Sequence, residues 1–210
     1  MRLLVVGPPG SDREAIADAI ALRLDVPRIS MSDVFQSEVR AVTPAAVQAQ
    51  HYMNSGDLVP VQVILSMIRN RLGQPDTATG FVLGNTPNQV LTAEALDATL
   101  SDLGTPVDRV IELVLPDAEV LRRLTGRRTC RVCGRIWHVE FAAPARPGTC
   151  DRCGGDLFQR YDDSPERVTA GLESYRPAVA PVLHHYRSLG KLVSVDATLA
   201  PSEIVRQATS

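Results

Sequence analysis

The first 24 residues constrain the fold of this chain more than any other segment. Residues 3–6 are apolar throughout, residues 7–11 read Gly-Pro-Pro-Gly-Ser, and residues 12–24 place Ile16, Ala19 and Ile20 on one helical face. Apolar runs of this kind form buried parallel strands, and the spacing that follows is that of an amphipathic helix. A strand, a glycine-containing turn and a helix in this order are typical of a phosphate-binding loop. The segment therefore predicts a parallel sheet with a ligand-binding edge.

The second half of this loop departs from the phosphate-binding pattern. Where such a loop has Gly-Lys and then a hydroxyl residue, this chain reads Asp12-Arg13-Glu14-Ala15. A carboxylate about 4 Å from a phosphate costs ~4 kcal/mol at an effective dielectric constant of 20. One interpretation is a capping box in which Ser11 and Glu14 satisfy the amides at the start of the helix. The alternative is an acidic loop that binds a cation or a basic partner.

The rest of the chain alternates between strand and helix patterns. Strands are predicted near residues 26–29, 81–83, 107–115 and 192–195, and helices over 33–55 with a break at Pro44, 61–72, 92–103, 118–124, 164–190 and at the C-terminal end. This alternation predicts an α/β fold with a doubly wound parallel sheet and inserted lobes.

Composition limits the classes of function. The chain has 210 residues, a hydrophobic content of 44% and a formal net charge of −2, which is typical of a folded soluble protein. No basic excess indicates a nucleic-acid surface, and no apolar stretch approaches the roughly 20 residues of a membrane span. We expect a cytoplasmic monomer that binds neither nucleic acid nor membrane.

All four cysteines lie in one short region and form two Cys-x-x-Cys turns, namely Cys130, Cys133, Cys150 and Cys153. Four thiolates at this spacing are typical of a tetrahedral zinc site with no open position, so the predicted role of Zn²⁺ is structural. Two disulfides or four unrelated thiols are the alternatives. Trp137 and Phe141 are the predicted core of this small lobe, and His138 is predicted to be a surface or packing residue.

Several further segments occur together with the loop and the cysteines, in the order Gly56-Asp57-Leu58-Val59-Pro60, Gly80-Phe81-Val82-Leu83, Gly126-Arg127-Arg128 and Arg160-x-Asp162-Asp163-x-x-Glu166. With them the chain resembles the adenylate kinase family over essentially its whole length, and most closely the long form with a zinc-bearing lid. The resemblance implies a P-loop nucleoside monophosphate kinase fold. Its expected parts are a core of residues 1–29, 61–121 and 161–210, a monophosphate-binding-like lobe of residues 30–60, and a lid of residues 122–160.

The same resemblance implies phosphoryl transfer between ATP and AMP with Mg²⁺, but only part of the family's charged set is present. The family's nucleotide- and phosphate-binding positions are still occupied by Gly7, Gly10, Ser11, Arg13 (where the family has lysine), Arg123, Arg127 and Arg160. Arg13, Arg123 and Arg160 are the remnants of the catalytic set, and Asp33 also remains. Positions that the family uses for charge, hydroxyl or base recognition are instead Met31, Gln36, Gly84, Asn88, Thr92 and Gly171.

Three hypotheses about function follow. The favoured one is an adenylate-kinase-like protein with a degenerate phosphate site, catalytically impaired or inactive, that serves as a scaffold or regulator. The second is an active nucleoside monophosphate kinase with an atypical loop, which would need Mg²⁺. The third is a module that binds a protein partner through the zinc lobe. The retained arginines leave open a nucleotide or other anion under the lid, or simple solvated charge.

Overall fold

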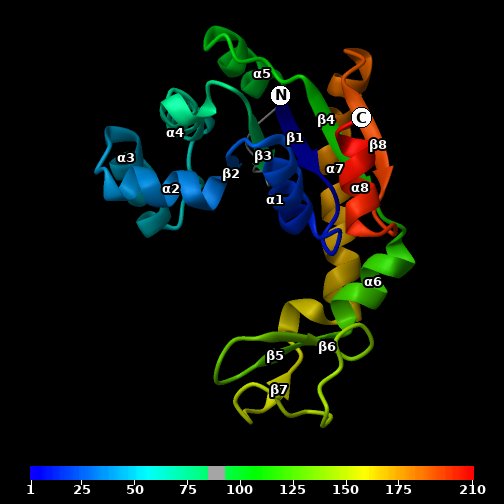
Figure 1. Cartoon of the computed structure of the whole chain (residues 1–210). Coiled ribbons are helices and arrows are strands. Elements are labelled where there is room, and N and C mark those ends of the chain that lie inside the picture. Colours follow the sequence, from blue (N-terminus) through cyan, green and yellow to red (C-terminus); the bar gives the residue numbers. More distant parts are fainter. Residues whose placement is uncertain (85–92) are drawn as a thin grey trace. The chain divides into compact units, whose positions relative to one another are not determined.

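The computed structural model describes residues 1–84 and 93–210. The strand at the N-terminus is the central strand of a five-stranded sheet (Figure 1). This strand, β1 (Arg2–Val6), pairs in parallel with β3 (Phe81–Gly84) on one side and with β4 (Arg109–Val114) on the other. The sheet has the order β2-β3-β1-β4-β8, with β2 (Arg28–Ser30) and β8 (Leu192–Asp196) at its edges. All four pairings are parallel, which confirms the predicted fold class.

The register of the sheet brings three strand ends to the same edge. Val5 of β1 and Ser30 of β2 both lie opposite Gly84, the last residue of β3. Ligands of open parallel sheets bind outside the carboxyl ends of the strands, at the point where strand order reverses. The predicted loop after β3 lies outside the described residues, as do Asn88 and Thr92.

The two faces of the sheet are covered by different helices. Leu4 and Val6 belong to a buried cluster with residues of α4 (Val61–Leu72), α5 (Ala93–Asp102) and the C-terminal half of α7 (Pro165–Ser188). Side chains alternate along a strand, so Leu3 and Val5 face the opposite side. On that side α1 (Arg13–Leu24) packs along β1, β2 and β3 and beside α8 (Pro201–Ala208).

The polar segment after β2 folds into two helices, α2 (Met31–Arg40) and α3 (Pro44–Ser55). Ser30 caps the first, accepting a hydrogen bond from the Asp33 amide at 3.1 Å, and Thr43 caps the second. Pro44 occupies the first turn of α3, where its missing N–H costs nothing, so the predicted break at Pro44 is confirmed. Buried Glu38 accepts hydrogen bonds from Thr43 at 2.7 Å and from Asn70 of α4 at 3.0 Å.

The chain divides into two compact units. The first comprises residues 1–7, 12–114 and 177–210, and the second comprises residues 8–11 and 115–176. The second unit contains α6 (Asp117–Thr125), the N-terminal half of α7 and an antiparallel sheet of order β6-β5-β7, formed by Ile136–His138, Arg127–Cys130 and Leu157–Phe158. Short 3₁₀ helices span Pro75–Thr77 and Tyr161–Asp163. The finer division into core, monophosphate lobe and lid remains a prediction.

No helix in the described part of the chain combines the length and the apolar character required to cross a membrane.

A buried polar group ties α5 to α7. Tyr186 is fully buried, and its hydroxyl donates a hydrogen bond to Asp97 at 2.9 Å. His185 Nε2 lies 2.7 Å from the second oxygen of the same carboxylate. Burial and the negative charge of Asp97 raise the pKa of Tyr186 well above its usual range, so the phenol remains a hydrogen-bond donor at ordinary pH.

We expect Tyr186→Phe to lower the free energy of unfolding by about 1 kcal/mol, because it removes the hydrogen bond to the half-buried carboxylate of Asp97. Urea denaturation followed by circular dichroism measures the change. The matched control is Tyr52→Phe, since the Tyr52 hydroxyl makes no hydrogen bond within residues 1–84 and 93–210. An equal loss in both variants would contradict a specific role for the bond with Asp97.

Candidate metal centre and phosphate site

Two turns of the same construction hold the four cysteines. In the first, the Gly134 amide donates to the Cys130 carbonyl at 3.1 Å. In the second, the Gly154 amide donates to the Cys150 carbonyl at 2.8 Å. Gly134 and Gly154 adopt positive φ angles of 69° and 73°, a conformation that costs glycine little. Each turn thereby brings two thiols to the same side.

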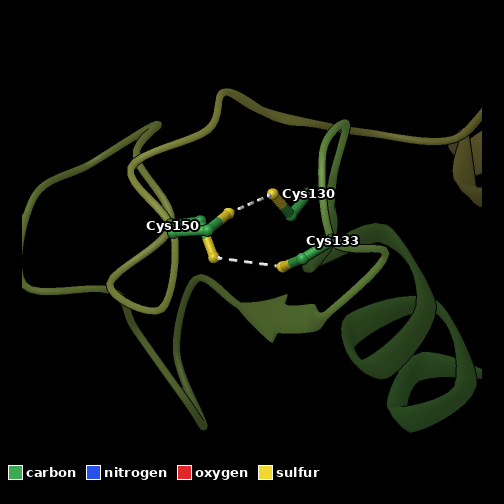
Figure 2. A group of neighbouring side chains, drawn as sticks. Cys130, Cys133 and Cys150 are labelled. Atoms are coloured by element: carbon green, nitrogen blue, oxygen red, sulfur yellow. Dashed lines mark hydrogen bonds between the residues drawn. The ribbon is translucent and has the colours of Figure 1, made fainter.

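The four thiols form one cluster that fits a metal ion. Their sulfur atoms all lie within 4.8 Å of one another, with Cys130 and Cys153 separated by 3.5 Å and Cys133 and Cys150 by 3.7 Å. Figure 2 shows the labelled thiols of Cys130, Cys133 and Cys150 pointing toward one another. Four sulfurs at about 2.3 Å from a tetrahedral Zn²⁺ lie about 3.8 Å apart. All four cysteines are free thiols, so the two-disulfide alternative is wrong.

Local hydrogen bonds prepare part of the cluster for deprotonation. Burial opposes ionisation of Cys150, but the backbone amides of Arg152 and Cys153 outweigh it and lower the pKa of this thiol to about 6. The Gly155 amide lowers the pKa of Cys153, but hydrogen bonding with Cys130 and Cys133 outweighs that effect and raises it to about 12. A bound metal displaces the remaining protons, because thiolate is the form that ligates.

The side chains around the cluster differ in part from the sequence prediction. Phe141 was a predicted core residue, but it is 52% exposed, with the Arg122 guanidinium 4.6 Å from its ring centre. Trp137 is half-buried, as a core residue of a very small lobe can be. His138 is buried and packs into the lobe: its Nδ1 accepts hydrogen bonds from two backbone amides, and its Nε2 lies 3.1 Å from the Arg123 carbonyl oxygen. A carbonyl only accepts, so this network requires the neutral tautomer with the proton on Nε2.

The predicted capping box at the start of α1 does not form. Ser11 is buried, and its hydroxyl donates to the Pro8 carbonyl at 2.7 Å instead of accepting from Glu14. Asp12 is the residue that precedes the helix; it adopts a left-handed conformation with φ 55° and makes no side-chain capping bond. The helix begins at Arg13, one residue later than a Ser11 cap requires. The acidic character of the first turn remains, because Glu14 lies within it.

Each of the three retained arginines of the second unit contacts a carboxylate of the same unit. Arg123 Nε donates to Glu119 at 2.9 Å, and its Nη1 donates to the Gly10 carbonyl at 3.2 Å. Arg127 forms an ion pair with Asp163, whose side chain is 1% exposed. Arg160 and Asp162 are 3.5 Å apart, and both are largely exposed.

Comparison with known proteins assigns the chain to a family. The sequence profile described as "Adenylate kinase" matches residues 5–191. This chain belongs to the adenylate kinase family. A protein of Salinispora tropica named adenylate kinase is 51% identical over 198 residues, which cover 94% of this chain and 91% of the relative.

Two further relatives support the assignment over the full length. A protein of Acidothermus cellulolyticus named adenylate kinase is 44% identical over 210 residues, covering 100% of this chain and 97% of the relative. One of Carboxydothermus hydrogenoformans with the same name is 40% identical over 204 residues, covering 97% and 95%. The five-stranded parallel sheet is consistent with the nucleoside monophosphate kinase fold of the family, as predicted.

Within this family fold, the structure also describes several positions where the sequence departs from the expected residue. Gln36 lies on α2 and accepts a hydrogen bond from Arg40 at 3.3 Å. Asp33 accepts a hydrogen bond from the Ser30 hydroxyl at 2.5 Å and pairs with Arg28 at 3.4 Å. Among the described residues, a Cβ added at Gly84 would meet the Cβ of Ala17 at 3.5 Å, which is an ordinary van der Waals contact.

Glu119 is a residue that the sequence prediction missed. It bonds both Arg122 and Arg123, and these two hydrogen bonds, first that of Arg123, lower the pKa of the carboxyl group. The signal was present as the spacing of Glu119 and Arg123, because residues four apart face each other on a helix.

We expect the purified chain to contain one zinc ion, and its removal by a strong chelator to unfold the zinc lobe, since few apolar side chains hold that lobe together. Metal analysis and limited proteolysis between residues 126 and 160 measure this. Cys150→Ser should behave like the chelated protein, while the sheet of the first unit keeps its circular dichroism signal. Protease resistance of the lobe without metal would contradict a structural role.

Proposed function

We propose that this member of the adenylate kinase family is impaired or inactive in phosphoryl transfer and serves as a scaffold or regulator. The observation that carries the proposal is the pairing of the retained arginines. Arg123 bonds Glu119, Arg127 pairs with Asp163, and Arg160 lies beside Asp162. The guanidinium groups that the family resemblance assigns to phosphate are thus engaged by carboxylates of this chain.

Phosphoryl transfer depends almost wholly on positioning and on stabilisation of phosphate charge by cations. An arginine that already pairs with a carboxylate must give up that partner, or bring the negative charge with it to the phosphate. For Arg127 the exchange is costly, because it leaves the buried Asp163 carboxylate without its cation. The internal ion pairs therefore lower the affinity for a nucleotide.

The loop after β1 adds a second unfavourable charge. Asp12 and Glu14 flank Arg13, so the segment carries one more negative than positive charge. The family pattern has glycines at these two places and a lysine between them. Anions bind helix N-termini through free amides and the helix dipole, and local carboxylates oppose that attraction. Binding of ATP in the family's usual manner is accordingly disfavoured.

The framework around this site is intact, which favours a role based on binding or on shape. The parallel sheet, the helices on both of its faces and the thiol cluster are all retained. Cys130, Cys133, Cys150 and Cys153 would hold Zn²⁺ as a structural ion, and Mg²⁺ is needed only if phosphoryl transfer is retained. We further propose a monomer that is divided into the core, lobe and lid expected from the family.

An active nucleoside monophosphate kinase is the second candidate. The relative from Salinispora tropica named adenylate kinase is 51% identical, and a cation is still present at position 13 of this chain. In this case Arg13 would replace the family's lysine, and a nucleotide other than AMP would be accepted. A thermal-shift screen of nucleoside phosphates separates the candidates, because a tight ligand raises the melting temperature.

We expect phosphorylation of AMP by ATP and Mg²⁺ to be at most about one-thousandth of the rate of the Salinispora tropica relative assayed in parallel. The loop is reverted by Asp12→Gly, Arg13→Lys, Glu14→Gly and Ala15→Thr. This reversion should not restore the rate, because the charged residues expected from the family are also absent at Gln36, Gly84, Asn88 and Gly171. Coupled enzyme assays measure both proteins.

Two further reversions make the test sharper. Among the described residues, a Cβ added at Gly171 would meet no atom within 4 Å, and one added at Gly84 would lie 3.5 Å from the Cβ of Ala17, so there is room for the Cβ of Gly171→Arg and of Gly84→Asp. Activity should rise only when these changes and Gln36→Arg are combined with the loop reversion. Robust turnover by the unaltered chain that Arg13→Ala abolishes would overturn the proposal.

The pairing of Arg123 can be tested separately. We expect Glu119→Gln to raise the affinity for ATP about two- to fivefold, because a pair of this kind contributes up to ~1 kcal/mol and the change removes the carboxylate that competes with phosphate for Arg123. Isothermal titration calorimetry measures the dissociation constant. Glu140→Gln is the matched control, since Glu140 bonds Arg122 and its replacement removes the same charge. Equal gains in both variants would indicate a general charge effect and contradict the role of this pair.

A further inference from the structure

The sheet of the zinc lobe has two faces with different chemistry. Arg127 lies opposite His138, and Arg128 lies opposite Trp137. Cys130 lies two residues after Arg128 on β5, and Leu157 of β7 lies opposite Cys130. Because side chains alternate along a strand, Arg128 and Leu157 share the face of Cys130, and Arg127 faces the other way. The arginine that the family resemblance assigns to phosphate is therefore on the opposite face.

A cavity of about 370 Å³ opens on the face of Arg128 and Leu157. Its other wall is the loop of residues 139–148, which contributes Val139, Pro144 and Pro147. Val139 is 53% exposed, so the apolar wall is accessible to solvent. A volume of this size accommodates one large apolar side chain together with its neighbours in a peptide.

The charge around the cavity is positive and poorly neutralised. Among the residues that the structure describes, the Arg128 guanidinium donates to the backbone carbonyls of Thr125 and Arg127, at 2.9 and 2.7 Å, and has no ion pair. Arg146 lies between the two prolines of the wall, is exposed, and has no ion pair within the described residues. Residues 126–160 contain seven arginines and three acidic residues, although the whole chain has a net charge of −2.

None of the three acidic residues of the lobe lines this cavity. Glu140 pairs with Arg122 of α6, and Asp151 accepts a hydrogen bond from the Ala145 amide of the loop at 3.0 Å. Asp156 precedes Leu157, so its side chain faces the other side of the strand. An apolar pocket beside guanidinium groups that lack a carboxylate is complementary to an apolar side chain next to acidic ones.

We propose that this cavity binds an acidic peptide segment of a protein partner, with one apolar side chain in the pocket and a carboxylate on Arg128 and Arg146. The inference rests on the scaffold role proposed above and names the surface that performs it. The occupant is separate from any nucleotide, because the cavity and Arg127 lie on opposite faces of the sheet.

The test uses the zinc-loaded full chain and fluorescent hexapeptides of fixed sequence. The probe is Asp-Glu-Leu-Phe-Asp-Glu, and the controls replace its acidic residues by lysine or its central pair by serine. Fluorescence anisotropy should show binding of the acidic apolar probe only. In methyl NMR spectra the probe should shift Val139 and Leu157, and ATP should not displace it.

Two variants and a matched control locate the site. Arg146→Glu and Val139→Ser change exposed residues, so the lobe should fold, and each should weaken binding about tenfold or more. Arg152→Glu makes the same charge change on an exposed residue outside the loop of residues 139–148, and it should alter binding less than about twofold. Equal binding of the control peptides, or equal loss in all three variants, would overturn the proposal.

Size-exclusion chromatography with light scattering excludes the other occupant. A dimer of the unaltered chain that Arg146→Glu dissociates would mean that a second copy fills the cavity, and would overturn the proposal. The kinase assay is independent of these readouts. An inactive chain that fails to bind the probe refutes the peptide site alone, whereas an active chain that binds it refutes only the proposed loss of catalysis.

Discussion

The parallel pairing of β1 with both of its neighbours is the interaction on which the rest of the first unit depends. Leu3, Leu4 and Val5 are almost fully buried, so both faces of this strand need a covering layer of helices. The same pairing sets Val5 opposite Gly84, which places the end of β3 at the edge where the loop after β1 begins. A shift of one residue would turn every apolar side chain of the strand to the wrong face. Any ligand site at this edge is a consequence of that register.

We attribute the proposed loss of phosphate chemistry to charge more than to shape. Glu119 and Asp163 provide internal partners for Arg123 and Arg127. Under the proposed function, phosphate chemistry and stability depend on different residues, so the first can be lost while the second is kept.

Much of the fold was predictable because its signals are local. The break at Pro44, the helix over residues 61–72 and the strand at Phe81 follow from periodicity and from backbone restrictions of single residues. The thiol cluster was predictable from spacing, because two Cys-x-x-Cys turns can each present two sulfurs to one ion. The absence of the capping box could not be predicted in this way, because the left-handed conformation of Asp12 depends on the turn at Pro8 and on the burial of Ser11. The exposure of Phe141 depends equally on the path of the loop that contains it.

The sequence by itself determined the alternation of strands and helices, the zinc-binding pattern and the acidic loop, since each is written in neighbouring residues. Only the tertiary structure decided which partner each charge has. Arg127 and Asp163 are 36 residues apart in the chain, and Arg123 and the Gly10 carbonyl are 113 apart. The cavity beside Arg128 likewise forms only when the loop of residues 139–148 folds against the strand that ends at Cys130. Contacts between residues so far apart in the chain depend on its topology, and the local spacing of residues does not predict them.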